Sequence, residues 1–379
     1  MSSKDDFLFK KNNLIKTNSG RKILKKGLFR DEGYLQFKKY VELSKKEYDS
    51  FVLRFQKDIL ELIESDASPD VTHEKFLKEI GGSQELRLEF GKFQEIKKNL
   101  LQGGNLTDRI KRILNSNFIK MTFPVFYALF DGYMKFTKNS DINMRNDIID
   151  GHLIAIDLSE PMDRIIDKDE DLDYLEDYKF LNPYILNLAK LKISKGGNRV
   201  FSEFENGFKN ALEGQQYDYE MKVGTRELTY ENIEHSYNKY RAILGTAGKN
   251  MSLNQKPLSE IYYIGMAKAA ESVGCGNEIQ DAIATKGIKS PSWPLYYSMM
   301  TTSVTKGFKL TLDKGFSYLA EANSALYMLE DNFEIKPFLN FLFLTVSHYN
   351  EYWYQELVQN RGDLMSKFQN DIDKKIIKS

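Results

Sequence analysis

Arg145 and His152 are the residues of this chain whose types and spacing could do chemistry on a phosphodiester. Asn146 follows the arginine directly, and the histidine comes seven positions after the arginine. An arginine can neutralise a scissile phosphate, and a histidine can handle the proton of an attacking 2′-hydroxyl group. The pair is therefore a candidate catalytic site of a ribonuclease, although Gly151 is expected to break the helix on which both residues would lie.

Metal ligands are too few and too scattered to predict a metal site. Cys275 is the single cysteine, and the chain has four histidines, none within five residues of another: His73, His152, His235 and His348. No zinc site of the usual His and Cys spacing can be drawn from them. An acidic run from Asp167 resembles the start of an EF-hand loop, but Leu172 stands where the loop needs glycine. The sequence predicts no metal and no cofactor.

Two glycine-bearing segments have the composition of nucleotide-binding loops but not their spacing. Residues 245–249 lack the first glycine of a phosphate-binding loop, and Asn250 follows the lysine where Ser or Thr is needed. Residues 274–276 lack a third glycine at the right offset. Both segments are therefore expected to be helix ends or turns, with Cys275 a small buried residue at a tight turn.

The surroundings of the arginine and histidine resemble a family motif at its loosest spacing. HEPN ribonucleases, compact helical domains of prokaryotic toxins and defence systems, use an arginine, often a polar residue after it, and a histidine a few positions on. The resemblance implies a ribonuclease in which Arg145 and His152 are catalytic. The alternative is an ordinary surface arginine and a histidine with satisfied hydrogen bonds. The nearby Asp147, Asp150 and Asp157 favour this alternative because they would repel RNA.

Composition indicates a folded protein of a reducing compartment. The 379 residues are 41% hydrophobic, with 25 Phe and 22 Tyr, so there is ample apolar surface for a core. A single cysteine excludes an internal disulfide framework. The lysine-rich N-terminus lacks the apolar core of a signal peptide, and the longest apolar stretch, residues 337–346, is about half of the roughly 20 residues that a membrane helix needs. We expect a cytoplasmic protein, with a nuclear address left open, and no membrane partner.

Charge is distributed unevenly along a chain whose net charge is zero. Residues 1–46 carry 13 Lys and Arg against five Asp and Glu, whereas residues 141–180 carry 13 acids against four bases. Such asymmetry suggests contact with a polyanion or with another copy of the chain. We therefore expect the basic N-terminal arm to dock on a neighbouring copy, with its acidic segment as one possible acceptor, giving rings or filaments.

Hydrophobic periodicity predicts an all-α fold. Phe51, Phe55, Ile59 and Ile63 recur at helical spacing, and alternating strand patterns are scarce. We predict helices of mostly 10 to 20 residues in two packed lobes. The predicted parts are a basic arm (1–46), an N-lobe ending in the acidic segment (47–180), a C-lobe (181–350) and a C-terminal tail (351–379). Predicted helix breaks are 68–70, 81–82, 103–104, 182–183, 196–197, 245–248 and 290–294.

The C-lobe interleaves cations with aromatic residues, as binding of single strands without base specificity requires. The lysines are Lys249, Lys256, Lys268, Lys286, Lys289, Lys306, Lys309 and Lys314, and the aromatics are Tyr262, Tyr263, Trp293, Tyr296, Tyr297, Phe308 and Phe316. A second group around two glycines could line a facing wall: Lys190, Lys192, Lys195 and Arg199. In the alternative interpretation, the aromatics pack in the core and the lysines form a solvated face. Trp293 argues against this alternative, because a tryptophan in a loop bounded by prolines is less expected to be a core residue.

In layout the chain resembles the nucleoproteins of negative-strand RNA viruses, with a basic arm, two helical lobes and a basic aromatic C-lobe. The resemblance implies that the chain coats single-stranded RNA, assembles into homo-oligomers through terminal arms, performs no catalysis and has a polymerase complex as a partner. Two alternatives stay open: the HEPN-like ribonuclease and a helical scaffold or adaptor.

Overall fold

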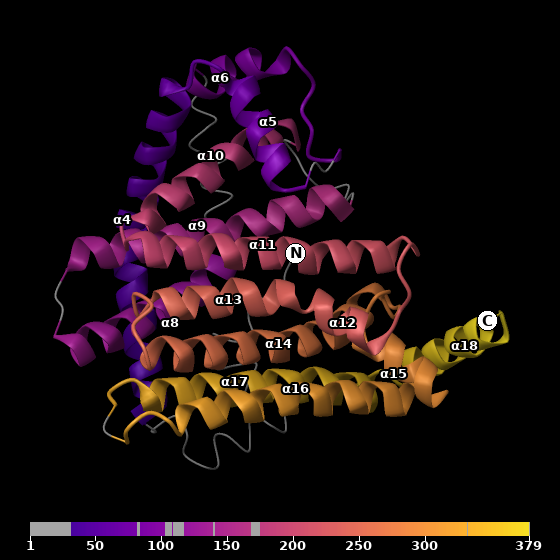
Figure 1. Cartoon of the computed structure of the whole chain (residues 1–379). Coiled ribbons are helices and arrows are strands. Elements are labelled where there is room, and N and C mark those ends of the chain that lie inside the picture. The colour runs from indigo at the N-terminus through magenta and orange to yellow at the C-terminus, as the bar shows by residue number, and fades with distance from the viewer. Residues whose placement is uncertain are drawn as a thin grey trace. The chain divides into compact units, whose positions relative to one another are not determined.

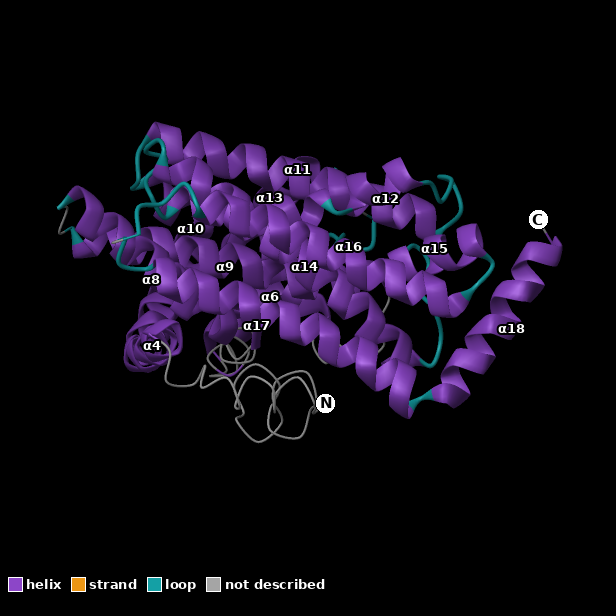
Figure 2. Ribbon diagram, turned by 90° about the horizontal axis from the view of Figure 1, so that it is seen from below, coloured by secondary structure: helices purple, strands orange, loops and turns teal. Residues whose placement is uncertain are grey.

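The computed structural model describes residues 32–81, 84–102, 108, 117–138, 141–167, 175–331 and 333–378. Every regular element in these ranges is helical and none is a strand (Figure 2). The all-α prediction is therefore confirmed. Most of the predicted basic arm and part of the acidic segment, residues 1–31 and 168–174, lie outside the described residues.

The chain divides into two compact units. Unit 2 comprises Lys39–Ser202, and unit 1 comprises the residues up to Lys38 together with Glu203–Ser379. Two helices, α4 (Glu32–Ser65) and α11 (Asn198–Lys222), each continue from one unit into the other. The predicted domain limits near residues 46, 180 and 350 stay a prediction.

Unit 2 contains the second part of α4. Its other helices are α5 (Pro69–Glu79), α6 (Lys92–Gln102), α8 (Asn117–Thr137), α9 (Ile142–Asp167) and α10 (Leu175–Ser194). Helix α9 packs against α8 and α10. Phe51, Phe55, Ile59 and Ile63 recur every four residues along α4, and each is at most 1% exposed. The predicted apolar stripe is therefore the core-facing side of this helix.

Unit 1 is a bundle of helices that run side by side (Figure 1). It contains α12 (Tyr230–Ser236), α13 (Asn238–Asn250), α14 (Leu258–Thr285), α15 (Trp293–Thr301), α16 (Val304–Leu326), α17 (Lys336–Gln355), a π-helical turn η2 (Glu356–Asn360) and α18 (Gly362–Lys378). The central helix α14 packs against α13, α16 and α17. The apolar stretch 337–346 forms the start of α17 with Phe338 and Phe343 buried, as predicted. No helix among the described residues is long and apolar enough to cross a membrane.

Several predicted breaks lie inside helices, because their glycines permit close packing and do not mark helix ends. Residues 245–248 fall within α13, and residues 274–276 fall within α14. A Cβ atom at Gly245 would lie 2.9 Å from the Tyr263 ring, and one at Gly276 would lie 2.2 Å from the Asn350 side chain. These predicted turns are therefore wrong, and the helices are longer than expected, with 28 residues in α14.

Other breaks are confirmed. Pro69 begins α5, residues 196–197 separate α10 from α11, and residues 290–294 contain the start of α15. The break at residues 182–183 is wrong, since Pro183 lies inside α10. The C-terminal residues 351–360 and 362–378 are helical, and Leu364, Phe368 and Ile372 of α18 are buried.

Candidate nucleic-acid interface

Arg145 and His152 do not form a site open to RNA. Both lie on α9, which continues through Gly151. The glycine allows α10 to pack closely there, since a Cβ atom would come within 2.6 Å of the Ile193 side chain. His152 is 2% exposed, its ring packs 6.3 Å from that of Phe126, and burial lowers its pKa to about 3. An enclosed neutral imidazole cannot take a proton from an attacking hydroxyl group in solvent. The predicted break at Gly151 is therefore wrong. The burial of His152 argues against catalysis by Arg145 and His152, which stays a prediction.

Arg145 has a structural role instead. Its guanidinium lies over the Tyr127 ring at 4.4 Å, and its Nη2 donates to Asn146 Oδ1 at 3.1 Å. A cation over an aromatic face, with a neighbouring amide as acceptor, is a stable surface arrangement.

Cys275 is equally inaccessible. It is 1% exposed in the middle of α14, and burial raises the pKa of its thiol. The Tyr237 hydroxyl group donates to its Sγ at 3.8 Å. The thiol is therefore a small core group, as expected, but in a helix and not at a turn. Within the described ranges, no group of three or more His, Cys, Asp or Glu side chains could hold a metal ion.

Trp293 is a core residue. Ser292 caps α15 by accepting from the Leu295 N–H at 3.2 Å, which makes Trp293 the first residue of this helix. Its side chain is 0% exposed, and its ring stacks on that of Tyr297 at 5.3 Å. The expectation that this tryptophan is something other than core is therefore wrong, since its ring offers no free face to a base.

The other predicted aromatics are also mainly packing residues. Tyr262 and Phe308 are at most 1% exposed. Tyr263, Tyr296, Tyr297 and Phe316 are half-buried. Stacking of bases on these rings can therefore contribute little in this conformation, and the cations have to carry any affinity for nucleic acid.

Two of the predicted lysines belong to a chain of alternating charges, the ionic network, inside unit 1. Glu271 is 0% exposed and binds Arg241 (Nε to Oε1, 2.7 Å) and Lys268 (Nζ to Oε2, 3.1 Å). The network has three cations and three carboxylates in the order Lys314, Glu234, Arg241, Glu271, Lys268 and Glu321. Because each cation already has a carboxylate partner, the network is neutral and offers no free charge to phosphate.

Burial and hydrogen bonding have opposite effects on the charge of Lys314 in this network. Burial opposes this charge, but the hydrogen bond to Glu234 prevails and raises the pKa of Lys314 to about 12. Tyr318 is 2% exposed, and the Nζ atoms of Lys314 and Lys268 lie 4.7 and 5.0 Å from its ring centre. Lys268 and Lys314 therefore tie α12, α13, α14 and α16 together. Lys249 is held similarly, at 2.8 Å from Glu203.

The cations of the other predicted wall, which lies in unit 2, also comprise ion-paired residues and exposed residues. Lys192 is buried and binds Asp58 at 2.8 Å, with Asp147 at 3.7 Å and Asp150 at 3.9 Å. Arg54 also donates to both carboxylate oxygens of Asp150, at 2.7 and 2.9 Å. Part of the acidic segment is thus neutralised inside unit 2. In the same wall, Lys190 pairs with Glu79, whereas Lys195 and Arg199 are exposed near the α10–α11 turn.

Four predicted lysines and one that was missed gather at one end of unit 1, here named the basic end: Lys286, Lys289, Lys306, Lys309 and Lys367. Lys367 Nζ donates to the Lys286 carbonyl at 2.7 Å, which joins α18 to the end of α14. Gln369 of α18 accepts from the Val304 N–H at 2.9 Å and donates to the Thr302 carbonyl at 3.2 Å, which joins α18 to the start of α16. Helix α18 therefore borders both lysine-bearing segments (Figure 1).

The lysines of the basic end are accessible. All five are exposed. Lys289 lies 3.5 Å from Asp281 with its side chain 60% exposed, and Lys309 pairs with the exposed Asp313 one helical turn away. Exposed pairs contribute only about 0–1 kcal/mol, so a phosphate can replace the carboxylate at little cost.

Lys256 does not belong to this group. It pairs with Glu260 at 2.7 Å near the start of α14, whereas Lys286 caps the other end of that helix. A helix of 28 residues is about 42 Å long, at about 1.5 Å per residue. The structure therefore separates Lys256 from the basic end.

Lys367 could have been found from sequence. Leu364, Phe368 and Ile372 recur every four residues, a spacing that predicts an amphipathic helix packed on the bundle.

Comparison with models of protein families and with curated proteins gives no match for this chain. The chemistry of the basic end therefore has to be inferred from its own residues, which are exposed ammonium groups that attract anions.

Proposed function

We propose that this protein binds single-stranded RNA without reading its base sequence, through the basic end of unit 1. The observation that carries the proposal is the gathering of five exposed lysines, from the loop after α14, from α16 and from α18, around one end of a helical bundle. Lysines at this density neutralise several phosphates and release their counterions, which is the main source of sequence-independent affinity.

The burial of the described aromatics determines which forces contribute to the proposed RNA binding. Trp293 is buried and Tyr296 and Tyr297 are half-buried, so stacking adds little to the electrostatic attraction. Binding should therefore weaken steeply with salt and vary little among base sequences. The proposal includes coating of RNA by a self-assembling protein without catalysis.

Purification without nuclease tests this function. The protein is passed through size-exclusion chromatography with light scattering, and absorbance is recorded at 260 and 280 nm across the peak. A large species with a high 260/280 ratio that collapses after RNase treatment is the expected result. A monomer or dimer without nucleic acid, which also fails to bind added RNA at low salt, would contradict the proposal and favour a helical scaffold.

A further inference from the structure

The end of unit 1 opposite the basic end is acidic and apolar. Helix α16 begins at the basic end and, after 23 residues or about 35 Å, leads into the loop before α17. This acidic end is formed by that loop and the first turn of α4, with four exposed acids and three exposed apolar residues: Glu32, Glu330, Asp331, Glu334, Leu35, Tyr327 and Met328. Tyr327 is 83% exposed and Met328 is 66% exposed.

Hydrogen bonds hold the parts of the acidic end together. Gln36 of α4 donates to the Glu334 carbonyl at 2.8 Å. Lys336, which lies beside these residues at the start of α17, donates to Asp331 Oδ1 at 2.7 Å and to the Leu329 carbonyl at 2.8 Å, so its charge is already engaged. Together, the residues named for the acidic end and Lys336 contain four carboxylates and one cation.

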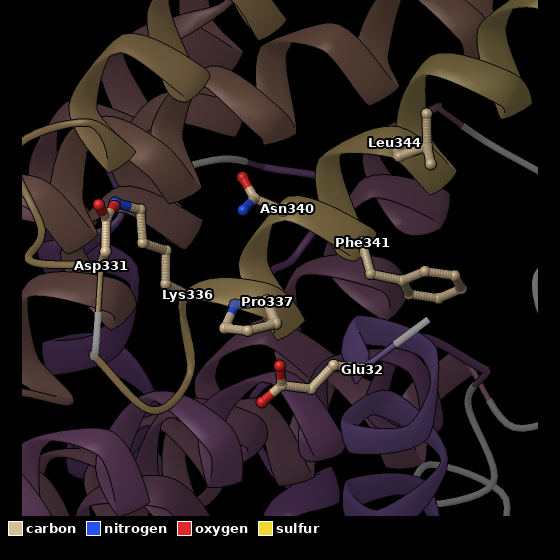
Figure 3. Close-up of a pocket in the computed structure, with 7 residues that line it drawn as sticks. All are labelled: Glu32, Asp331, Lys336, Pro337, Asn340, Phe341 and Leu344. Atoms are coloured by element: carbon tan, nitrogen blue, oxygen red, sulfur yellow. The ribbon is translucent and has the colours of Figure 1, made fainter. Parts of the chain in front are cut away.

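A cavity of about 370 Å³ opens within this surface (Figure 3). Glu32 faces Pro337 of α17 across it, Asp331 and Lys336 lie on its loop side, and Phe341 and Leu344 supply apolar wall. Both side chains are half-buried. The cavity can take an apolar side chain, while the surrounding carboxylates attract cations.

We infer that residues 21–30 of the same chain dock on the acidic end. Their sequence, Arg-Lys-Ile-Leu-Lys-Lys-Gly-Leu-Phe-Arg, contains five cations, no acid and two apolar pairs. The segment ends two positions before Glu32, which lines the cavity, so it is tethered at the surface that its charge and apolar residues complement. Such tethering gives a high effective concentration, which favours docking within one chain over capture by another copy.

Docking would also control whether the cations of residues 21–30 can contact other molecules. While residues 21–30 cover the acidic end, their five cations are not available to RNA or to a neighbouring copy. This inference does not depend on RNA binding by the basic end, because the two surfaces share no residue.

Zero-length cross-linking of the full chain tests the docking. A carbodiimide joins lysines to carboxylates that they contact, and an equal mixture of ¹⁴N- and ¹⁵N-labelled protein shows whether both come from one chain. The expected products join Lys22, Lys25 or Lys26 to Glu330, Asp331 or Glu334, in peptides of a single isotope. The absence of these products, or their formation between the two isotopes, would overturn docking within the chain.

Charge reversal provides an independent test. In the full chain carrying Asp331→Lys and Glu334→Lys, trypsin should cleave within residues 21–30 at least about fivefold faster than in the parent, since attractive exposed pairs become repulsive. The matched control carries Glu213→Lys and Glu227→Lys, two exposed sites of unit 1 outside the acidic end. It should be cleaved within about twofold of the parent rate. Equal rates in the two double variants would overturn the proposal.

Discussion

Lysines of the same sequence segment have opposite roles in the ionic network and at the basic end. Lys268 is 20% exposed and binds the fully buried Glu271, whereas Lys289 is 60% exposed and lies 3.5 Å from the half-buried Asp281. A buried carboxylate needs its cation, because an unpaired buried charge costs several kcal/mol, but a carboxylate that is partly open to solvent can exchange its cation for water or phosphate. The burial of the partner thus separates a structural lysine from one that can bind a ligand.

The largest expected effect follows from breaking the ionic network. Arg241→Leu leaves Glu271 short of a cation and should lower the free energy of unfolding by about 3–5 kcal/mol, measured by urea denaturation. The folded variant should bind RNA with the affinity of the parent.

Arg226→Leu is the matched control for that variant. The Arg226 side chain is 31% exposed and that of Arg241 is 30% exposed, but Arg226 pairs with Glu220, which is 26% exposed, and Glu271 is fully buried. The loss should stay at about 1 kcal/mol. Equal losses in the two variants would show that burial of the carboxylate does not decide the role of its cation.

The pH dependence of stability should report on buried groups in both units. Burial raises the pKa of Glu278 to about 8 from its ordinary 4.5, and it lowers the pKa of His152 to about 3 from 6.5. The contribution of Glu278 is fully present below about pH 4.5 and is lost as pH rises through about 8. That of His152 is fully present above about pH 6.5 and is lost as pH falls through about 3.

From these two groups, stability should decline above about pH 6.5 and below about pH 4.5. Urea denaturation across this range measures the two declines. Glu278→Gln should remove the alkaline decline and leave the acid one. An unchanged alkaline decline in this variant would mean that Glu278 ionises normally.

The all-α class and the main core helices could be predicted from sequence, because an apolar stripe such as Phe51, Phe55, Ile59 and Ile63 directly reflects the period of a helix. The roles of glycines such as Gly245 and Gly276 could not be predicted from sequence, since glycine is typical both of helix ends and of close contacts between helices. The role of Lys268 depends on Arg241, Glu271 and Glu321, whose association exists only in the folded chain.

For the candidate site, the sequence identified Lys286, Lys289, Lys306 and Lys309 but did not distinguish them from Lys268 and Lys314. All six follow the same pattern of lysines among aromatic residues. Trp293 was misjudged because its flanking prolines suggest a loop, whereas the Ser292 cap starts a helix and Pro294 lies in its first turn.

A smaller effect is expected from single changes at the basic end. Lys306→Ala should weaken RNA binding about three- to tenfold at low salt, because one phosphate contact is lost, and should change the free energy of unfolding by less than about 0.5 kcal/mol. Fluorescence anisotropy with labelled RNA and urea denaturation measure the two quantities. A large loss of stability would place Lys306 with the structural lysines.

The smallest effect is expected at Lys256, at the other end of α14. Lys256→Ala should change RNA affinity by less than about twofold, since an exposed cation remote from the site acts only through screened attraction. A loss in the same anisotropy titration equal to that of Lys306→Ala would mean that the RNA-binding surface extends along the whole of α14.

The salt dependence of RNA binding tests the central claim most directly. The affinity of the parent protein for a single-stranded RNA is measured against salt concentration and compared with that of a variant carrying Lys286→Ala, Lys289→Ala, Lys306→Ala and Lys309→Ala. If the basic end binds phosphates, the slope of log affinity against log salt should be smaller in magnitude by about 3 in the variant, from about 0.7 per lost contact. Equal slopes and affinities would contradict binding at the basic end.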